Sequence, residues 1–334
     1  MSDTARTMKV DVIGGGVMGL ATGWALKRRG VDPVVYEQFE VGNPRGSSHG
    51  RSRIFRLAYP EEHYVRLAQE SLGLWRELEA ESGESILELH GLVEIVSSLD
   101  ESTAPTLERC GVAWERLERE DAESRFPIRV PEGAFAVLQP EAGIARADKA
   151  LAAFKRELDV REGAKVQPDE LDADVVVVTA GSWVNQLLDD PLPVRTTRET
   201  VCYFRPESRP VPSVVSFHHD RLKHDMYSLH DPVHGLKVGA HHAGREADPD
   251  VPTQPQPELV ERITEWTNET YRLAEPEPVA VDTCMYTTTA DESFVLERRG
   301  RIVVGSPCSG HGFKFAPAIG ERLANLALEA TTIL

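Results

Sequence analysis

One glycine-rich stretch near the N-terminus, residues 10–37, constrains the fold of this chain more than any other feature. Apolar residues 10–13 run into a turn, apolar residues then recur at helical spacing, and residues 34–36 form a second apolar run. This order predicts a strand, a helix and a second strand. The turn carries Gly14, Gly16 and Gly19 in the G-x-G-x-x-G pattern, which is typical of a dinucleotide site with its pyrophosphate at the helix N-terminus.

Glu37 ends the second predicted strand, where an acidic side chain accepts hydrogen bonds from a ribose diol. A basic residue at this point would instead favour a 2′-phosphate. The unit therefore predicts NAD or FAD as the ligand, not NADP. It leaves the choice between NAD and FAD open.

Length and charge limit the classes of partner. The chain has 334 residues and a formal net charge of -17, which argues against nucleic acid or an anionic membrane surface as partner. The N-terminus has no apolar signal region, and no stretch of about 18 apolar residues occurs, so we expect a cytoplasmic protein without a membrane span. Four widely spaced cysteines (Cys110, Cys202, Cys284, Cys308) give neither a disulfide pattern nor a metal pattern. We expect no metal.

The remaining segments predict two kinds of architecture. Residues 61–82, 146–158 and the end of the chain have the apolar spacing of helices, whereas 91–97, 133–139 and segments within 195–250 (VCYF, VVSF, GLKVGA) alternate like strands. The apolar run in 173–183 and the short run 301–305 predict further strands, the former buried on both faces of a parallel sheet.

The predicted fold class is α/β, with a Rossmann-like dinucleotide domain and a second, mainly antiparallel substrate domain. We place residues 1–82, 143–190 and 284–334 in a discontinuous dinucleotide-binding domain, and residues 83–142 and 191–283 in the substrate domain.

The loop after Glu37 is unusually basic for an acidic chain. Arg45, Arg51, Arg53 and Arg56 all occur in it. A solvated basic loop is one explanation. The other is anion binding, because functional loops gather at the carboxyl edge of such a sheet.

Three further motifs carry a family resemblance. Residues 46–56 (GSSHGRSRIFR), 283–287 (TCMYT) and 309–315 (SGHGFKF), together with the glycine unit, resemble the monomeric sarcosine oxidase family. Its members are FAD enzymes with a D-amino-acid-oxidase-like fold, and they oxidise N-methyl and other secondary amino acids. The resemblance implies FAD covalently attached through Cys284, substrate carboxylate binding by Arg56 and Lys314, and oxygen activation by Lys237.

The same resemblance implies a common cavity lined by Arg53, Tyr227, His241, Tyr286 and His311. Two stretches depart from the family pattern, a short segment between residues 160 and 174 and the sequence HDPVH after Tyr227. The expected cofactor contacts are Gly14, Gly16, Val17, Met18, Gly19, Glu37, Ser48, His49, Arg53, Ala180, Gly181, Trp183, Cys284, Met285, Gly310, Gly312, Phe313 and Lys314.

The residue types also suit this chemistry on their own. An arginine fork with a second cation, such as Arg56 with Lys314, holds a carboxylate well. Gly310 and Gly312 precede the last predicted helix, where backbone N–H groups and the helix dipole favour negative charge. Cys284 has an alternative role as a small buried thiol, and Cys308 is a second candidate for the attachment.

We therefore expect an FAD-dependent oxidase that converts a secondary amine and oxygen into an imine and hydrogen peroxide, with hydrolysis then releasing an aldehyde. Sarcosine or another N-methyl amino acid is the first candidate substrate. A cyclic imino acid (proline or pipecolate), N-methyltryptophan and a fructosyl amino acid are alternatives. An NAD-dependent dehydrogenase and a flavin-binding protein without turnover are the alternatives from other classes. We expect a monomer whose partners are the amino acid and O2.

Overall fold

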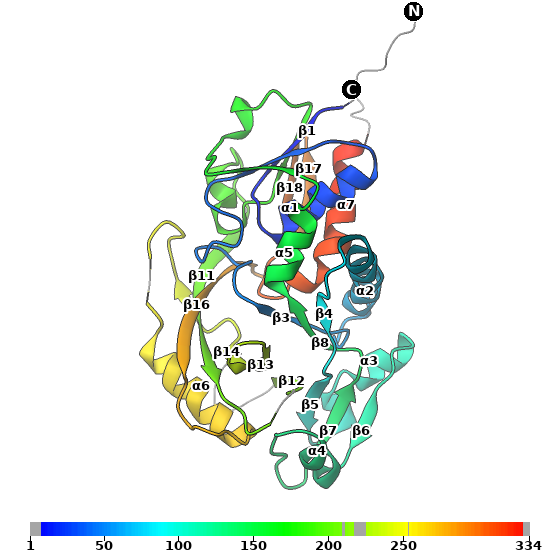
Figure 1. Cartoon of the computed structure of the whole chain (residues 1–334), viewed down its shortest axis with the longest axis vertical. Helices are drawn as coiled ribbons and strands as arrows, with labels where there is room; N and C mark the ends of the chain where they lie inside the picture. Colours follow the sequence, from blue (N-terminus) through cyan, green and yellow to red (C-terminus); the bar gives the residue numbers. More distant parts are fainter. Residues whose placement is uncertain (1–7, 209–210, 217–224, 253, 330–334) are drawn as a thin grey trace, which may run out of the picture.

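The computed structural model describes residues 8–208, 211–216, 225–252 and 254–329 (Figure 1). Its strands form a six-stranded, a nine-stranded and a three-stranded sheet. The principal helices are α1 (Val17–Arg28), α2 (Glu62–Ser82), α3 (Ala104–Arg109), α4 (Arg119–Arg125), α5 (Ala147–Lys155), α6 (Pro257–Thr270) and α7 (Ala316–Leu328). In the described residues, no helix combines the length and apolarity needed to cross a membrane.

The six-stranded sheet has the order β17-β18-β10-β1-β2-β9. All neighbouring pairs are parallel except β17 with β18, which form a hairpin. All four residues of β10 are buried, as expected for a strand with parallel neighbours on both sides. The bounds are β1 (Val10–Ile13), β2 (Val34–Glu37), β9 (Asp159–Glu162), β10 (Val175–Val178), β17 (Val295–Arg299) and β18 (Ile302–Ser306).

The nine-stranded sheet is antiparallel apart from the β5–β12 pair. Its path is β15-β11-β14-β13-β12-β5-β7-β6, and β16 pairs with β11 over ten residues. The bounds are β5 (Leu92–Val96), β6 (Glu115–Leu117), β7 (Phe135–Gln139), β11 (Val194–Phe204), β12 (Ser213–Ser216), β13 (Met226–Asp231), β14 (Gly235–Ala240), β15 (Arg245–Glu246) and β16 (Ala280–Thr289).

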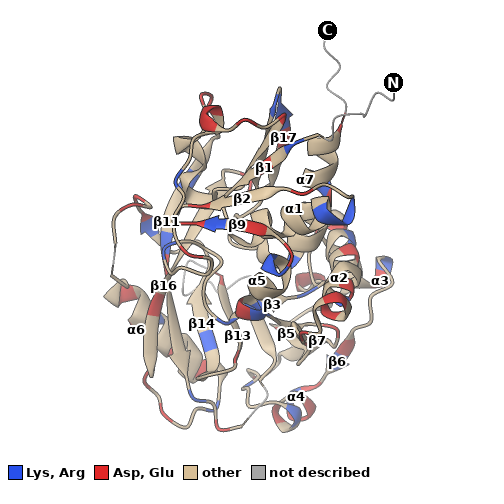
Figure 2. Cartoon of the chain, turned by 45° about the horizontal axis from the view of Figure 1, so that its top comes forward, with Lys and Arg blue, Asp and Glu red and all other residues tan. Residues whose placement is uncertain are grey.

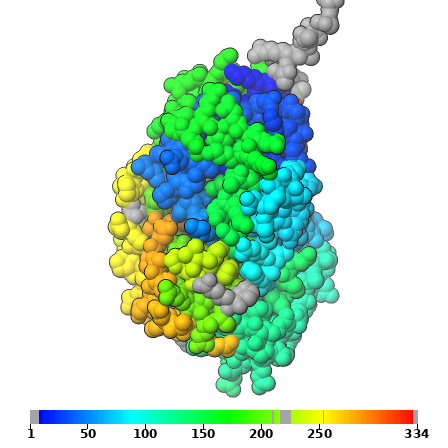
Figure 3. Space-filling view, in the orientation of Figure 1, coloured from blue at the N-terminus to red at the C-terminus, as the bar shows by residue number. Residues whose placement is uncertain are grey.

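A small sheet of β3 (Ser52–Phe55), β8 (Gly143–Arg146) and β4 (Leu87–Glu88) lies between the two large sheets (Figure 1). In the space-filling view, the N-terminal segments in blue and the green segment adjoin in the upper half of the molecule (Figure 3). The dinucleotide part of the fold is thus assembled from distant segments.

Helices α1 and α7 pack closely because Gly320 has no side chain. A Cβ at this position would lie 2.6 Å from the carbonyl oxygen of Ala21. Basic and acidic residues lie side by side on α1, α2 and α7 (Figure 2), including Arg28 with Glu77 at 2.6 Å. Such exposed ion pairs contribute only about 0–1 kcal/mol each, so apolar packing must stabilise this helix layer.

These findings confirm the predicted α/β class and the strand–helix–strand unit. The predicted helices at 61–82 and 146–158 correspond to α2 and α5. Phe217, at the end of the predicted strand VVSF, lies outside the described residues. β16 spans the predicted domain boundary at residue 284, and the domain boundaries stay a prediction.

Gly19 offers a test of the glycine pattern, because helix propensity and packing predict opposite effects of Gly19→Ala. A Cβ at Gly19 would lie 1.9 Å from Gly14 O and 2.7 Å from Thr179 Oγ1. We expect the overpacking to outweigh the gain in helix propensity. The free energy of unfolding, measured by urea denaturation, should therefore fall by about 1–3 kcal/mol. Gly73→Ala in α2 is the matched control, because nothing lies within 4 Å of its added Cβ. That variant should be more stable by about 0.5–1 kcal/mol.

Candidate active site

A cavity of about 490 Å³ lies where the β1–α1 turn meets the nine-stranded sheet. Of the residues that the sequence assigned to the site, only Gly19 and His49 do not line it. Gly19 packs against the Gly14 carbonyl instead. The His49 ring lies between Gly46 O, 2.9 Å from Nδ1, and Asp282 Oδ2, 3.7 Å from Nε2.

The β1–α1 turn forms a cradle for an anionic group. Gly14 has a φ of 107°, and a Cβ there would lie 2.5 Å from Thr179 O, so this position requires glycine. Gly16 stands at the N-cap of α1 without a side-chain cap. Ser48 Oγ accepts a hydrogen bond from Val17 N at 3.0 Å. The backbone N–H groups at this helix end can therefore donate to an oxygen atom that lies outside the helix.

Glu37 is held in place by two backbone donors. Its Oε2 accepts from Gly15 N at 2.8 Å and its Oε1 from Phe39 N at 2.9 Å. Burial raises the pKa of this carboxyl, and the two hydrogen bonds oppose the rise. Gly15 was not among the predicted contacts. A Cβ at this position would lie 2.8 Å from Glu37 Cβ, so the close approach of the turn to Glu37 depends on the missing side chain.

The loop after β2 is fixed from within by Arg53. This side chain donates to the carbonyls of Ser52, Ser47 and His49 at 2.8, 2.6 and 2.7 Å. Its guanidinium carbon lies 5.6 Å from the centre of the Phe313 ring. Arg53 thus joins the basic loop to the C-terminal motif.

Arg56 and Lys314 meet around the ring of Tyr59. The guanidinium carbon of Arg56 lies 4.0 Å from the ring centre, and Lys314 Nζ donates to Tyr59 Oη at 2.9 Å and to His311 O at 2.7 Å. Both cations are buried, with exposed fractions of 9% and 4%. Burial, and then the charge of Arg56, lower the pKa of Lys314 well below its usual range. This environment favours an added anion.

Neighbouring strands and helices hold these two cations from behind. Gln139 Oε1, on β7, accepts from Leu57 N at 3.0 Å and fixes the backbone after Arg56. Trp75 Nε1, on α2, donates to the carbonyl of Lys314 at 2.9 Å.

The imidazoles of the cavity are neutral at physiological pH. Burial, and next the charge of Lys314, lower the pKa of His311 to about 3. Burial also lowers the pKa of His241 well below its ordinary value. His241 Nδ1 lies 3.4 Å from Tyr286 Oη. Burial raises the pKa values of Tyr286 and Tyr227, so their hydroxyl groups keep their protons.

Lys237 and Cys284 reach the cavity through strand register. Lys237 on β14 pairs with Tyr203 of β11, and Glu199 of β11 pairs with Cys284 of β16. Burial, and then Arg53, lower the pKa of Lys237 to about 8. Burial raises the pKa of Cys308, which disfavours its thiolate.

The glycines of the C-terminal motif serve packing as well as any ligand. Gly310 has a φ of 73°, and a Cβ there would lie 2.4 Å from the Tyr286 ring. Gly312 N donates to Cys308 O at 2.9 Å. This N–H is therefore bonded within the motif, and the predicted role of the motif's backbone N–H groups at the cofactor stays a prediction.

Sequence reasoning missed the aromatic side chains around His311. Tyr59, Tyr64 and Phe294 have ring centres 5.9, 5.1 and 4.8 Å from the His311 ring. Burial raises the pKa of Tyr59 to about 12, so it stays a neutral hydrogen-bond partner of Lys314. The only signal in the sequence was that Tyr59 follows Arg56 in the same loop.

A glycine cradle at a helix end, an acid that ends β2 and a cavity with buried cations define a dinucleotide-binding oxidoreductase. The family model of FAD dependent oxidoreductases matches residues 9–326, and the chain belongs to this family. FAD is therefore the dinucleotide, which decides the choice against NAD.

Two relatives and one solved structure define the neighbourhood of this chain. It is 34% identical to a human peroxisomal sarcosine oxidase, over 96% of this chain and 92% of that protein. It is 30% identical to a monomeric sarcosine oxidase of Bacillus sp. strain B-0618, over 97% and 93% of the two chains. The open form of NikD, an unusual amino acid oxidase essential for nikkomycin biosynthesis, superposes with a TM-score of 0.83 at 27% identity, covering 98% and 96%.

Proposed function

We propose that this FAD enzyme oxidises a secondary amino acid, with sarcosine or another N-methyl amino acid as the first candidate. Arg56 and Lys314, buried together on Tyr59, are the observation that carries the proposal. Their donors suit a carboxylate inside a small cavity, and the sarcosine oxidases among the relatives support an N-methyl substrate. Cyclic imino acids and fructosyl amino acids stay as alternatives.

The residues present fit FAD along the whole cavity. Gly14, Gly15 and Gly16 leave a cradle that side chains would fill, at the N-terminus of α1, where Ser48 Oγ accepts from Val17 N. Glu37 is placed for the ribose diol. FAD, when bound, supplies the acceptor for a hydride equivalent from the amine carbon.

The residues of the protein contribute to the reaction by orienting the substrate and by setting the charge around its amine. Arg56 and Lys314 fix the carboxylate, so the amine carbon can take one position relative to the aromatic side chains of Tyr59, Tyr64 and Phe294. The cationic surroundings disfavour a protonated amine, which favours the neutral form that reacts. His241 and His311 are neutral, and they can accept or donate a hydrogen bond at the amine without adding charge.

The role of Lys314 predicts a loss of carboxylate affinity in Lys314→Met. The variant removes one of two buried cations, so binding of methylthioacetate should weaken by about 2 kcal/mol or more, roughly thirtyfold. The measurement is a titration followed by the flavin spectrum of the holoenzyme. Lys149→Met on α5, at the surface, should leave the affinity unchanged. Equal affinities for wild type and Lys314→Met would remove Lys314 from the carboxylate site.

Lys237 is proposed as the cation that stabilises the charge on O2 as it accepts electrons. In Lys237→Met, flavin absorbance should return more slowly when the substrate-bleached enzyme meets O2, while bleaching by the amine is largely retained. Since the pKa of Lys237 is about 8, the wild type loses this charge as pH rises through 8. The difference between wild type and variant should therefore narrow above pH 8. Slower bleaching with unchanged recovery would place Lys237 on the substrate.

Cys284 is proposed as the attachment point of FAD, because its side chain lines the cavity beside Met285 and Tyr286. Acid precipitation of the wild type should then give a yellow pellet, whereas Cys284→Ala should release the yellow colour into the supernatant. Cys308→Ala is the matched control and should keep the pellet yellow. A wild-type supernatant that carries the flavin would mean non-covalent binding.

We further propose a cytoplasmic monomer. The monomeric sarcosine oxidases among the relatives support the monomer, whereas the human relative is peroxisomal by name. The mass of the holoenzyme in solution tests the oligomeric state.

A further inference from the structure

A group of two imidazoles and one carboxylate lies at the seam between the small sheet and the nine-stranded sheet. Glu88 ends β4, His90 follows two residues later, and His230 lies near the end of β13. One ligand atom from each lies within 4.8 Å of the other two. None of the three lines the cavity of the proposed active site. We propose that they bind one divalent transition-metal ion of the Zn²⁺ class.

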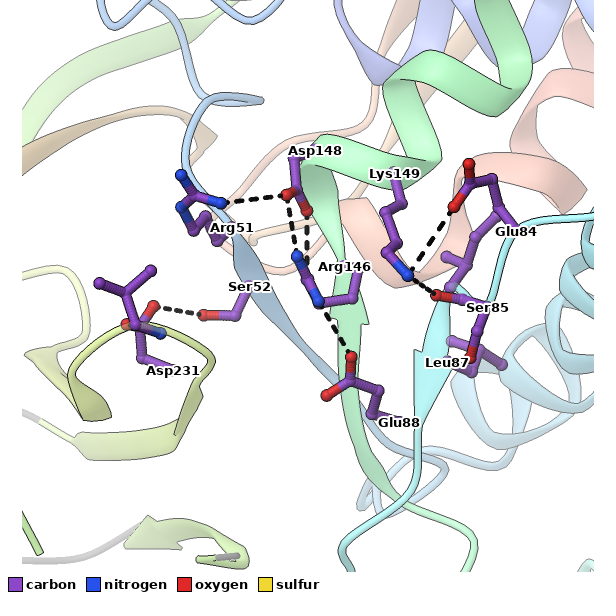
Figure 4. Close-up of polar contacts among 12 residues, drawn as sticks. Arg51, Ser52, Glu84, Ser85, Leu87, Glu88, Arg146, Asp148, Lys149 and Asp231 are labelled. Atoms are coloured by element: carbon purple, nitrogen blue, oxygen red, sulfur yellow. Dashed lines mark hydrogen bonds and ion pairs between the residues drawn. The ribbon is translucent and has the colours of Figure 1, made fainter.

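The carboxylate of Glu88 is already oriented for such a site. Its Oε1 accepts from Arg146 Nη1 at 3.1 Å, and its Oε2 lies 3.7 Å from His90 Nε2. Figure 4 shows Arg146 between Glu88 and Asp148, with Arg51 beyond. Carboxylates that bind metals are commonly held in this way by a second hydrogen bond. Arg146 is then a positioning residue that directs Oε2 at the imidazoles.

His90 supplies an independent observation. Its Nε2 is closed to water and has no hydrogen-bond partner among the residues that the structure describes. An unsatisfied buried polar atom costs about 1–3 kcal/mol. The ring meets that of His230 at a centroid distance of 5.1 Å and an interplanar angle of 79°. A metal ion between the rings would use the lone pair that no donor satisfies.

The ligand set selects the class of ion. Imidazole nitrogen and carboxylate oxygen suit Zn²⁺, whereas Mg²⁺ and Ca²⁺ prefer oxygen alone. Ligand atoms around a tetrahedral Zn²⁺ lie about 3.4 Å apart, given bonds of about 2.1 Å. The present separation of Glu88 and His90 is 3.7 Å, so small side-chain rotations close the site. Three protein ligands leave a position for water.

The ion would connect the β13–β14 hairpin of the nine-stranded sheet to the small sheet. β13 and β14 carry Tyr227 and Lys237 of the proposed active site. Their connecting turn is held by Asp231, whose Oδ1 accepts from the N–H groups of Val233 and His234. His230 adjoins this turn, and Glu88 and His90 belong to the other side of the seam. Metal binding would therefore stabilise the placement of the hairpin.

A second group of potential ligands, His241, His242 and Glu292, contains two cavity-lining residues and provides a control. His242 Nε2 lies 3.4 Å from Glu292 Oε1. Zinc bound there would be lost in His242→Asn. Zinc bound at the seam would be lost in His90→Asn and in His230→Asn.

The test is a zinc titration of the holoenzyme after treatment with EDTA and dialysis, in competition with a chromophoric chelator. We expect one site with a Kd of about 1 µM or below in the wild type. Binding should weaken at least about tenfold in His90→Asn, His230→Asn and Glu88→Gln. His234→Asn on the same hairpin, where the ring packs on Tyr203, should bind like the wild type. Zinc should also raise the melting temperature of the wild type but not of His90→Asn.

Two results would overturn the proposal. One is a wild-type protein that binds no zinc at 100 µM free ion, on the order of a hundred times the expected Kd; this needs no variant and is unaffected by misfolding. The other is binding that His242→Asn abolishes and His90→Asn retains. Both readouts are metal binding, so they are independent of the substrate that the enzyme oxidises.

Discussion

The burial of two like charges around Tyr59 is the constraint on which the site depends. Lys314 Nζ has two neutral acceptors, Tyr59 Oη and the carbonyl of His311, and Arg56 lies against the ring face. Desolvation of a charge is costly, and its neighbour adds repulsion. The surrounding fold must therefore hold both side chains rigidly. Gln139 and Trp75 contribute through contacts with backbone atoms, and the charged ends donate to protein acceptors, Arg56 to the Ala58 carbonyl and Lys314 to Tyr59 Oη and the His311 carbonyl.

Sequence reasoning succeeded where a function is written in contiguous residues. The turn from Gly14 to Gly19 and the acid at Glu37 are local, and the structure confirms the strand–helix–strand unit around them, whereas their contacts with the cofactor stay a prediction. It succeeded less with residues assembled by long-range pairing. Lys237 and Cys284 become neighbours of one cavity only through β11, and only the family resemblance pointed to them.

One physical reason explains why the sequence did not reveal the other residues of these sites. Tyr64 lies on the partly exposed face of α2 and Phe294 just before β17, and neither position has a pattern that differs from ordinary packing. The pair His90 and His230 shows the same limit. Their rings meet 5.1 Å apart because β13 reaches the small sheet, whereas the sequence shows two separate histidines without ligand spacing.

In the β13–β14 hairpin, the strand register determines which side chains can reach the cavity. Lys237 and Gly239 share one face of β14 because side chains alternate along a strand, and Gly239 pairs with Tyr227 of β13. A Cβ at Gly239 would lie 2.5 Å from Tyr227 Oη, so the absence of a side chain lets the tyrosine lie across β14 and hydrogen-bond with Tyr286. A slip of one residue would turn Lys237 to the opposite face. The position of Lys237, the proposed catalytic cation, is thus fixed by the same pairing that places the tyrosine, and the proposed ion at the end of β13 would hold that register from outside the cavity.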